Sequence, residues 1–137
     1  MKQLLSFIAV VVLATAACSD AFTPTADNML GDYTARTLTT TDTHGTVEWI
    51  ARGASLTISL GPSGTVTGHL FLPAAATGGG DLDTPLIGNW VLTGSTISFD
   101  MPAIDTFIRD MPWTADRHRL SGDHTFSGTR IRVVLTK

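Results

Sequence analysis

The clearest structural signal in the chain is PLIGNWVLTGSTISFDM, residues 85–101. Large apolar residues alternate with small polar ones on both sides of a turn at Thr93-Gly94-Ser95. A period of two is typical of a strand with one buried face, so this stretch predicts a half-buried antiparallel hairpin. One face of the hairpin holds Trp90, Leu92, Ile97, Phe99 and Met101, and the other holds Asn89, Val91, Thr96, Ser98 and Asp100.

Two further hairpins show the same alternation. Their turns are Gly61-Pro62-Ser63-Gly64 and Ser127-Gly128, and these residue types are typical of tight turns because they tolerate or preset the backbone angles. Less regular strand-like runs precede them in the chain. We therefore expect hairpins over residues 56–72 and 125–136, and strands at 33–40 and 47–51.

Two segments between the hairpins are less regular. Residues 73–83 are small and glycine-rich, which predicts a mobile loop. The three glycines at 78–80 are not followed by Gly-Lys-Ser/Thr or by a helical pattern, so nucleotide binding is not expected. Residues 102–110 fit either one turn of an amphipathic helix or a ragged strand, and Pro112 limits both.

The composition favours β-structure over long solvated helices. Lys2 and Lys137 are the only lysines and Glu48 is the only glutamate, whereas Thr, Val, Ile and Ser are abundant. The 137 residues are enough for one domain with a sizeable core. The formal charge of -3 gives no indication of a nucleic-acid partner.

The N-terminal residues predict an export signal. Lys2 precedes an apolar run at 4–14, and this run is shorter than the roughly 18 to 20 residues that span a bilayer. Leu13-Ala14-Thr15-Ala16-Ala17-Cys18 resembles the lipobox of bacterial lipoproteins, in which the cysteine is lipidated and becomes the mature N-terminus. Ordinary cleavage at Ala14-Thr15-Ala16 would instead release a soluble protein that begins at Ala17.

The lone cysteine favours the lipoprotein alternative. Cys18 excludes an internal disulfide, and lipidation would explain its presence in an exported chain. Ser19 after it is compatible with transport to the outer membrane in lipoproteins of two-membrane bacteria. We expect a signal peptide at 1–17, a flexible tether at 18–29, and a protein anchored in the cell envelope that faces the periplasm.

Residues 30–137 predict an all-β domain. Seven or eight short strands with tight turns are compatible with a sandwich or a closed barrel. Sequential hairpins close naturally in up-and-down order, and closure removes exposed strand edges. We therefore expect a small antiparallel meander barrel of about eight strands after the signal helix and the tether.

A family resemblance accompanies this pattern. It is carried by four segments, Gly31-Asp32-Tyr33, Gly53-Ala54-Ser55-Leu56-Thr57, Ile87-Gly88-Asn89-Trp90 and Ile131-Arg132-Val133-Val134-Leu135. With these segments the domain resembles the small lipocalin-like domains of bacterial lipoproteins. The resemblance implies a β-barrel and includes no catalytic motif. The domain is shorter than a typical lipocalin and lacks a clear long C-terminal helix.

The inward-facing apolar residues form the first candidate site. The interior of a barrel of about eight strands is just wide enough for side chains or for one small ligand. These residues therefore either fill the core or line a site for a small apolar ligand. They are Tyr33, Leu56, Ile58, Val66, Leu70, Trp90, Leu92, Ile97, Phe99, Ile131 and Val133.

Four arginines form the second candidate site. Arg117 and Arg119 are two residues apart, as are Arg130 and Arg132, so the members of each pair would lie on one face of a strand. If the two strands pair antiparallel, the four arginines could lie on one outer face of the sheet. Such a face would suit phosphate or carboxylate groups of lipids or of a partner protein. The alternative is an ordinary solvated face balanced by nearby carboxylates. Those carboxylates are Asp110, Asp116 and Asp123.

The sequence carries no motif for catalysis or metal binding. It has no G-x-S-x-G, and its histidines lack the short spacing of zinc sites. Only barrel closure would bring two of them together with Asp81 or Asp83. We therefore expect no enzyme activity, no metal and no cofactor. The histidines are His44, His69, His118 and His124.

Two functions fit these observations. The first is a lipid-anchored, non-enzymatic envelope protein, monomeric, that binds a small apolar ligand inside the barrel. The second is a protein-interaction module, such as an inhibitor or an envelope assembly factor, that uses a loop or the arginine face. An empty apolar interior would favour the first, and a packed interior with an exposed patch would favour the second.

Overall fold

The computed structural model describes residues 21–75 and 78–137, and these residues form an all-β domain with little helix. Two single-turn α-helices and two 3₁₀ turns interrupt the strands in this part of the chain. The strands are β1 (Gly31–Asp42), β2 (Gly45–Glu48), β3 (Ser55–Leu60), β4 (Thr65–Leu72), β5 (Leu82–Thr93), β6 (Thr96–Asp100), β7 (Trp113–Asp116), β8 (Arg119–Phe126) and β9 (Thr129–Thr136). The helical elements are α1 (Ala26–Met29), η1 (Ile50–Arg52), η2 (Pro62–Gly64) and α2 (Phe107–Asp110).

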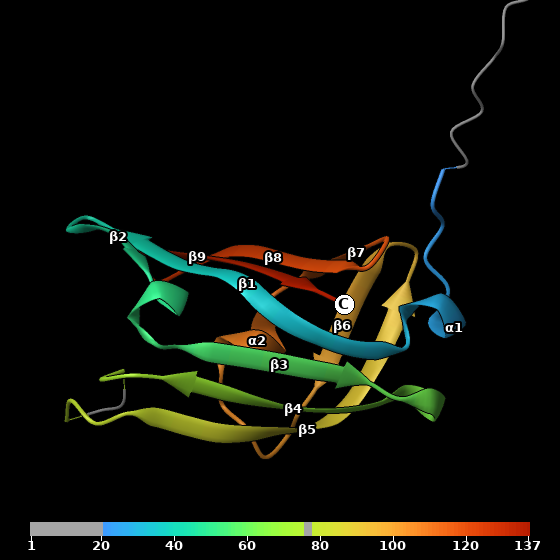
Figure 1. The fold of residues 1–137 in the computed structure, drawn as a ribbon, viewed down its shortest axis with the longest axis horizontal. Coiled ribbons are helices and arrows are strands. Elements are labelled where there is room, and N and C mark those ends of the chain that lie inside the picture. The colour runs from blue at the N-terminus through green and yellow to red at the C-terminus, as the bar shows by residue number, and fades with distance from the viewer. Residues whose placement is uncertain (1–20, 76–77) are drawn as a thin grey trace, which may run out of the picture.

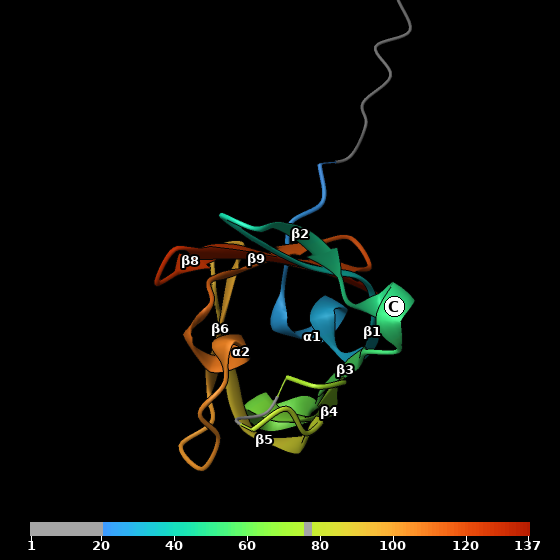
Figure 2. The ribbon, with the colours of Figure 1, turned by 90° about the vertical axis from the view of Figure 1, so that its left-hand side faces the viewer.

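The sheet closes into an antiparallel barrel of eight strands (Figure 1). Strands β3 to β9 pair in chain order, and β1 closes the ring by pairing with β3 on one side and β9 on the other. The closed ring is visible from one end of the molecule (Figure 2). Strand β2 pairs only with the last part of β1 and extends beyond the ring. The predicted meander barrel is therefore confirmed, and the sandwich is excluded.

The hairpin predicted from residues 85–101 is β5 and β6. Trp90 pairs with Phe99 and Leu92 with Ile97, so the four large side chains lie on the inner face. Trp90 is only 5% exposed, and its indole Nε1 donates a 3.0 Å hydrogen bond to the carbonyl of Gly61. Met101, directly after β6, is completely buried.

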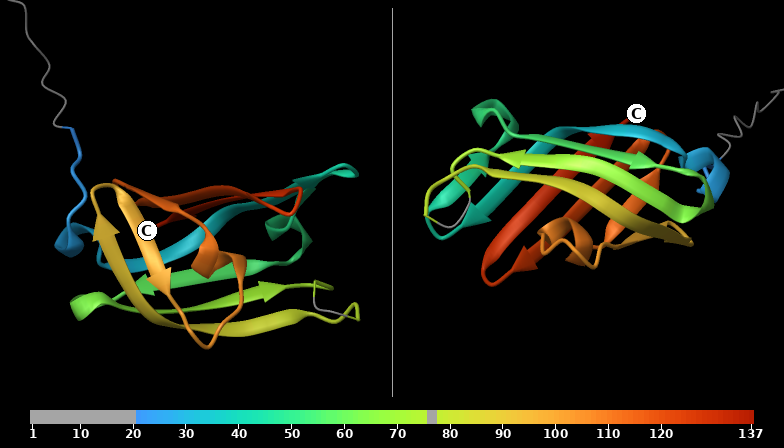
Figure 3. Two further views of the ribbon diagram at one scale, coloured as in Figure 1. Left: turned by 180° about the vertical axis from the view of Figure 1, so that it is seen from behind. Right: turned by 90° about the horizontal axis from the view of Figure 1, so that it is seen from below.

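Strand β5 is longer than β6 and curves strongly around the barrel (Figure 3). The curve passes Gly88, whose side-chain position faces inward. A Cβ at Gly88 would overlap the carbonyl oxygen of Asp100, so only glycine permits this close approach of the two backbones. The pairing of β5 with β6 ends beside it, at Asn89 and Asp100.

The barrel wall is weakest between β6 and β7. These strands share only two residue pairs, in which Thr96 and Ile97 lie opposite Thr114 and Trp113. The segment after β6 crosses the gap that results, and α2 packs its Ile108 completely into the interior. Figure 2 shows α2 along this side of the ring.

One end of the barrel is closed by α1. Thr25 caps this turn in a capping box with Asn28, and Met29 is completely buried. The hydroxyl of Tyr33 donates a 2.8 Å hydrogen bond to the carbonyl of Met29. The folded part therefore begins before Leu30, because residues 26–29, predicted to belong to the flexible tether, are held by this cap and this buried side chain.

Three local predictions are refined by the structure. The ambiguous segment 102–110 ends in a helical turn, α2, instead of a strand. The strand predicted at 47–51 ends at Glu48, because Ile50–Arg52 forms a 3₁₀ turn that Gly53 terminates with a left-handed φ of 95°. The strand predicted at 33–40 is longer at both ends, since β1 runs from Gly31 to Asp42.

Candidate functional site

The barrel interior is filled by the predicted apolar set. Nine of its eleven residues are buried, and the other two, Leu92 and Ile131, are partly buried and pack against them. The nine belong to a single cluster and come from β1, β3, β4, β5, β6 and β9. They are Tyr33, Leu56, Ile58, Val66, Leu70, Trp90, Ile97, Phe99 and Val133.

Further interior side chains come from segments that sequence reasoning left outside the candidate set. Met29 enters from α1, Ile108 from α2, and Met111 and Trp113 from the chain that follows. Trp113 is completely buried, and its indole Nε1 donates a 3.0 Å hydrogen bond to the carbonyl of Ile108. The alternation of Met111, Trp113 and Ala115 was the available signal for this wall, although Pro112 obscures it.

Gly122 shows how tightly this interior is packed. It faces inward from β8, opposite Trp113 on β7 and Val133 on β9. A Cβ at Gly122 would overlap the sulfur of Met111, and it would lie 3.1 Å from Met111 Cγ and 3.3 Å from Trp113 Cε3. Met111 therefore occupies the volume that a side chain at Gly122 would need.

Two hollows lie on the outside of the barrel. One, of about 270 Å³, lies over β7, β8 and β9 and has a mixed polar and apolar lining that includes Thr114, Asp123 and Arg132. The other, of about 480 Å³, lies between β5 and the segment after β6. We call it the edge hollow. Its lining is Thr84, Pro85, Ile87, Gly88, Asn89, Pro102, Ala103 and Ile104.

Two large hydrophobic side chains are exposed among the described residues, and one of them, Ile87, lines the edge hollow. Ile87 is 64% exposed and Val91 is 61% exposed. Both lie on the outer face of β5, in register with Thr67 of β4 and Ser98 of β6 respectively. The two side chains are four residues apart on this face of the strand, or roughly 13 Å, with Asn89 between them.

The arginines do not form one cluster. Arg119 pairs across β8 and β9 with Thr136, whereas Arg130 and Arg132 lie toward the other end of the same strands. Arg119 is about four residues from Asp123 along β8, or roughly 13 Å. Arg117 lies in the β7–β8 turn, with its guanidinium 5.3 Å from the centre of the Phe22 ring.

Each half of the arginine set has its own aspartate. Arg119 contacts Asp116 at 3.2 Å, and Arg130 makes two hydrogen bonds to Asp123, of 2.8 and 2.6 Å. Arg132 also lies 3.3 Å from Asp123. The hydrogen bonds from Arg130 lower the pKa of Asp123 below its usual value. This arrangement matches the alternative of a solvated face balanced by carboxylates more closely than a free anion site.

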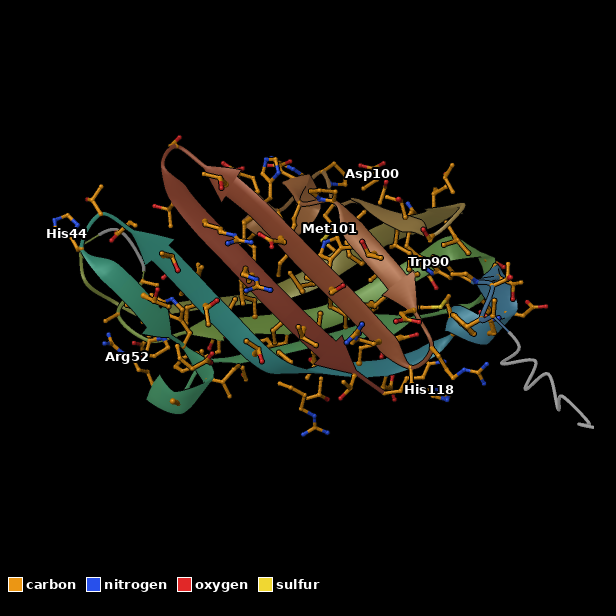
Figure 4. All side chains as sticks on the ribbon, turned by 90° about the horizontal axis from the view of Figure 1, so that it is seen from above. His44, Arg52, Trp90, Asp100, Met101 and His118 are labelled. Carbon is orange, nitrogen blue, oxygen red and sulfur yellow. The ribbon has the colours of Figure 1, made fainter. Side chains whose placement is uncertain are left out.

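The histidines are dispersed over the barrel. His44 and His118 lie at opposite ends of the molecule (Figure 4). His69 of β4 does meet Asp83 of β5 on the outer face, at 2.5 Å between Nε2 and Oδ1, and both side chains are about half exposed. No group of three metal-ligating side chains occurs among residues 21–75 and 78–137.

Tyr33 is the one strongly perturbed acid of the interior. Its burial beneath the α1 end of the barrel raises the pKa of its hydroxyl to about 12. The hydroxyl already donates to the Met29 carbonyl, so its role is to fasten α1 to the barrel.

Cys18, the predicted lipidation site, lies outside the described residues, as do the predicted signal peptide and the first part of the tether. In the part of the chain that the structure does describe, no helix is long and apolar enough to cross a membrane. Comparison of the chain with protein-family models, with curated proteins and with solved structures gave no match.

Proposed function

We propose that this chain is a lipid-anchored, non-enzymatic protein of the bacterial cell envelope that works by binding another protein on its outer surface. The observation that carries the proposal is the contrast between the two faces of β5. Its inner residues Leu86 and Trp90 belong to a continuous apolar core, whereas its outer residues Ile87 and Val91 are exposed and Ile87 lines the edge hollow. The interaction is therefore assigned to the outside of the barrel.

The interior supports this choice over ligand binding. Met111 occupies the space above Gly122, Ile108 fills the gap between β6 and β7, and Met29 closes one end. A ligand of even modest size would have to displace these side chains from low-energy packing. Binding of a small apolar ligand, which the lipocalin-like resemblance suggests, is therefore the second candidate.

The anchor is supported by the sequence around Cys18 and by the position of α1. The chain enters the barrel at the α1 end (Figure 1), where Phe22 packs against the core. A lipidated Cys18 would be separated from this entry by only a few residues. The barrel would then lie close to the bilayer with its α1 end toward it, and the loops at the opposite end would point away.

The anchor is tested by mass spectrometry of the mature N-terminus after expression in a bacterium with two membranes. We expect Cys18 to be the first residue and to carry an acyl-modified thioether. An unmodified chain that begins at Ala17 would overturn the anchor.

The choice between outer-surface and interior binding is tested on the protein purified from membranes. We expect native mass spectrometry to find no stoichiometric apolar ligand, and a fluorescent fatty acid to show no saturable binding. Met111→Ala is the matched variant for interior binding, because it opens volume inside the barrel and leaves the outer face unaltered. Saturable binding of the fatty acid by the unaltered protein, reduced by a filling substitution at Ile97, would contradict the proposal.

A further inference from the structure

The edge of β5 that faces away from β4 is unpaired over half of the strand. The pairing with β4 runs from Leu82 to Asn89, but the pairing with β6 begins only at Asn89. Among the described residues, no strand pairs with the other side of residues 82–88. This open edge is seven residues long, or about 23 Å.

The edge hollow lies directly at this edge. Residues in an extended strand alternate between its two faces, yet the hollow is lined by outward-facing Pro85 and Ile87 and also by Thr84 and Gly88 of the opposite parity. Only a hollow at the side of the strand reaches both sets. Its second wall is Pro102, Ala103 and Ile104 of the segment after β6, which projects beside β5 (Figures 2 and 3).

Pro85 gives independent support for an edge. A proline has no backbone N–H, so it is tolerated within a sheet where its nitrogen faces away from a paired strand. Because every second residue of a strand presents its backbone groups to the same neighbour, Asp83 and Ile87 then have their N–H groups on the open side, together with the carbonyl of Pro85. The Pro85 carbonyl accepts a 3.3 Å hydrogen bond from the Thr84 hydroxyl, and its second lone pair, together with the two N–H groups, is available to an added strand.

The charge around the edge identifies the chemistry of the partner. Residues 81–110 contain five aspartates and one arginine, a formal charge of -4, whereas the whole chain carries -3. Asp83 lies on the edge itself, and Asp105 follows the far wall with a side chain that is 94% exposed. Arg109, the arginine of this segment, is held by Asp105 at 3.0 Å and by Asp110 at 2.8 Å.

From these observations we infer that the open edge of β5 binds an extended peptide segment that has apolar side chains in its middle and lysine or arginine at its ends. This inference rests on the proposed function and names the partner class. Backbone pairing with β5 supplies the register, the edge hollow takes one apolar side chain beside Ile87, and the acidic rim favours the basic flanks.

Two other occupants fit less well. A second copy of this chain would bring an acidic edge against an acidic edge, which is repulsive. An anionic membrane surface would be repelled by the same aspartates. Strand β8 also extends past its partner, from Asp123 to Phe126, but the hollow near it is smaller and has a more polar lining.

The test uses the full mature protein and a fluorescent peptide of sequence KKTVTITKK. The comparison peptides are EETVTITEE and a form of the lysine peptide that is N-methylated at its five central residues, so that those residues cannot donate backbone hydrogen bonds. We expect the lysine peptide to bind saturably and both comparison peptides to bind about tenfold more weakly or worse, because one interaction class is lost in each.

Two variants of β5 locate the binding. Ile87→Ser removes the exposed side chain that borders the edge hollow, and Val91→Ser removes an almost equally exposed one from the part of β5 that is paired with β6. We expect Ile87→Ser to weaken binding of the lysine peptide about tenfold, which corresponds to about 1.4 kcal/mol, and Val91→Ser to change it less than about twofold. Amide exchange at Asp83 and Ile87 should slow when the peptide binds.

Several results would overturn the inference. They are no saturable binding of the lysine peptide up to about 1 mM, equal binding of the glutamate peptide, or equal weakening by the two serine variants. Light scattering that showed a dimer lost in Ile87→Ser would assign the edge to a second copy instead. The proposed function fails separately, through a ligand bound inside the barrel, so the two failures are distinguishable.

Discussion

The packing of Met111 above Gly122 leads to a quantitative prediction about the barrel interior. Gly122→Ala adds one methyl group where the sulfur of Met111 lies. The backbone at Gly122 is not in the left-handed region, so the cost is steric, and overpacking of this kind destabilises by about 1 to 3 kcal/mol. Met111→Ala removes a side chain that is 2% exposed and should cost about 2 to 5 kcal/mol.

The double variant separates a filled interior from an empty one. When Met111 is already alanine, the methyl group at Gly122→Ala meets no sulfur and enters the space that was vacated. The double variant should therefore be no less stable than Met111→Ala alone, which gives a coupling energy of about 1 to 3 kcal/mol in a double-mutant cycle. Urea unfolding followed by tryptophan fluorescence measures the four free energies of unfolding.

A surface glycine supplies the control for this cycle. A Cβ at Gly80 would meet no atom within 4 Å and its φ is not positive, so Gly80→Ala should change stability by less than about 0.5 kcal/mol. If Gly122→Ala were equally harmless, or if the two interior substitutions were additive, the space above Gly122 would be free. A barrel with that free volume would favour the small-ligand function over the outer-surface function.

Three further predictions concern single residues. Trp90→Ala should destabilise by roughly 3 to 5 kcal/mol, because it removes a buried aromatic ring and the hydrogen bond to Gly61; a loss near zero in urea unfolding would mean that the ring is not in the core. Tyr33 is the one tyrosine of the chain, so tyrosinate absorbance near 295 nm should titrate near pH 12 in the folded protein and near pH 10 in denaturant. The free energy of unfolding should therefore fall as the pH rises from about 10 toward 12. A midpoint near 10 in the folded protein would show that the ring is not buried. Replacing Arg130 and Arg132 by alanine should leave the free energy of unfolding almost unchanged at pH 7, because their ion pairs with Asp123 are exposed. Any loss should disappear as the pH falls through the lowered pKa of Asp123, since the protonated carboxyl no longer attracts the arginines. Unfolding of the variant at pH 7 would place these side chains inside the barrel.

Short-range patterns were sufficient for the strands and for most of the core. The β5–β6 hairpin follows from the alternation around Thr93 to Thr96, because a period of two in a half-buried strand assigns every side chain to one face. The same alternation placed Leu56, Ile58 and Val133 inside the barrel. Closure of the meander also followed, since sequential hairpins leave two edges that can pair only with each other.

Segments without a period were harder to predict. Met29 and Ile108 are buried from single helical turns, and four residues carry too little periodicity to reveal an inward face. The alternation of Met111 with Trp113 indicates an inward side chain, but the contact of Met111 with Gly122 depends on how β8 lies in the barrel. The positions of the arginines likewise depended on the register of β8 and β9. The two-residue spacing of the arginines assigns them to a face of the sheet, but it does not say how far apart they lie along the strands.

The sequence by itself determined which residues of the hairpin strands face inward, that consecutive strands pair, and where an export signal and a lipidation site are expected, because each of these depends on neighbouring residues. Only the tertiary structure decided how far each strand is paired. β5 continues past the end of β6 because Gly88 lets the strand curve away while Met101 and α2 turn into the core. The open edge beside Ile87 is a product of strand lengths and of where the chain bends in three dimensions, and no local pattern encodes it.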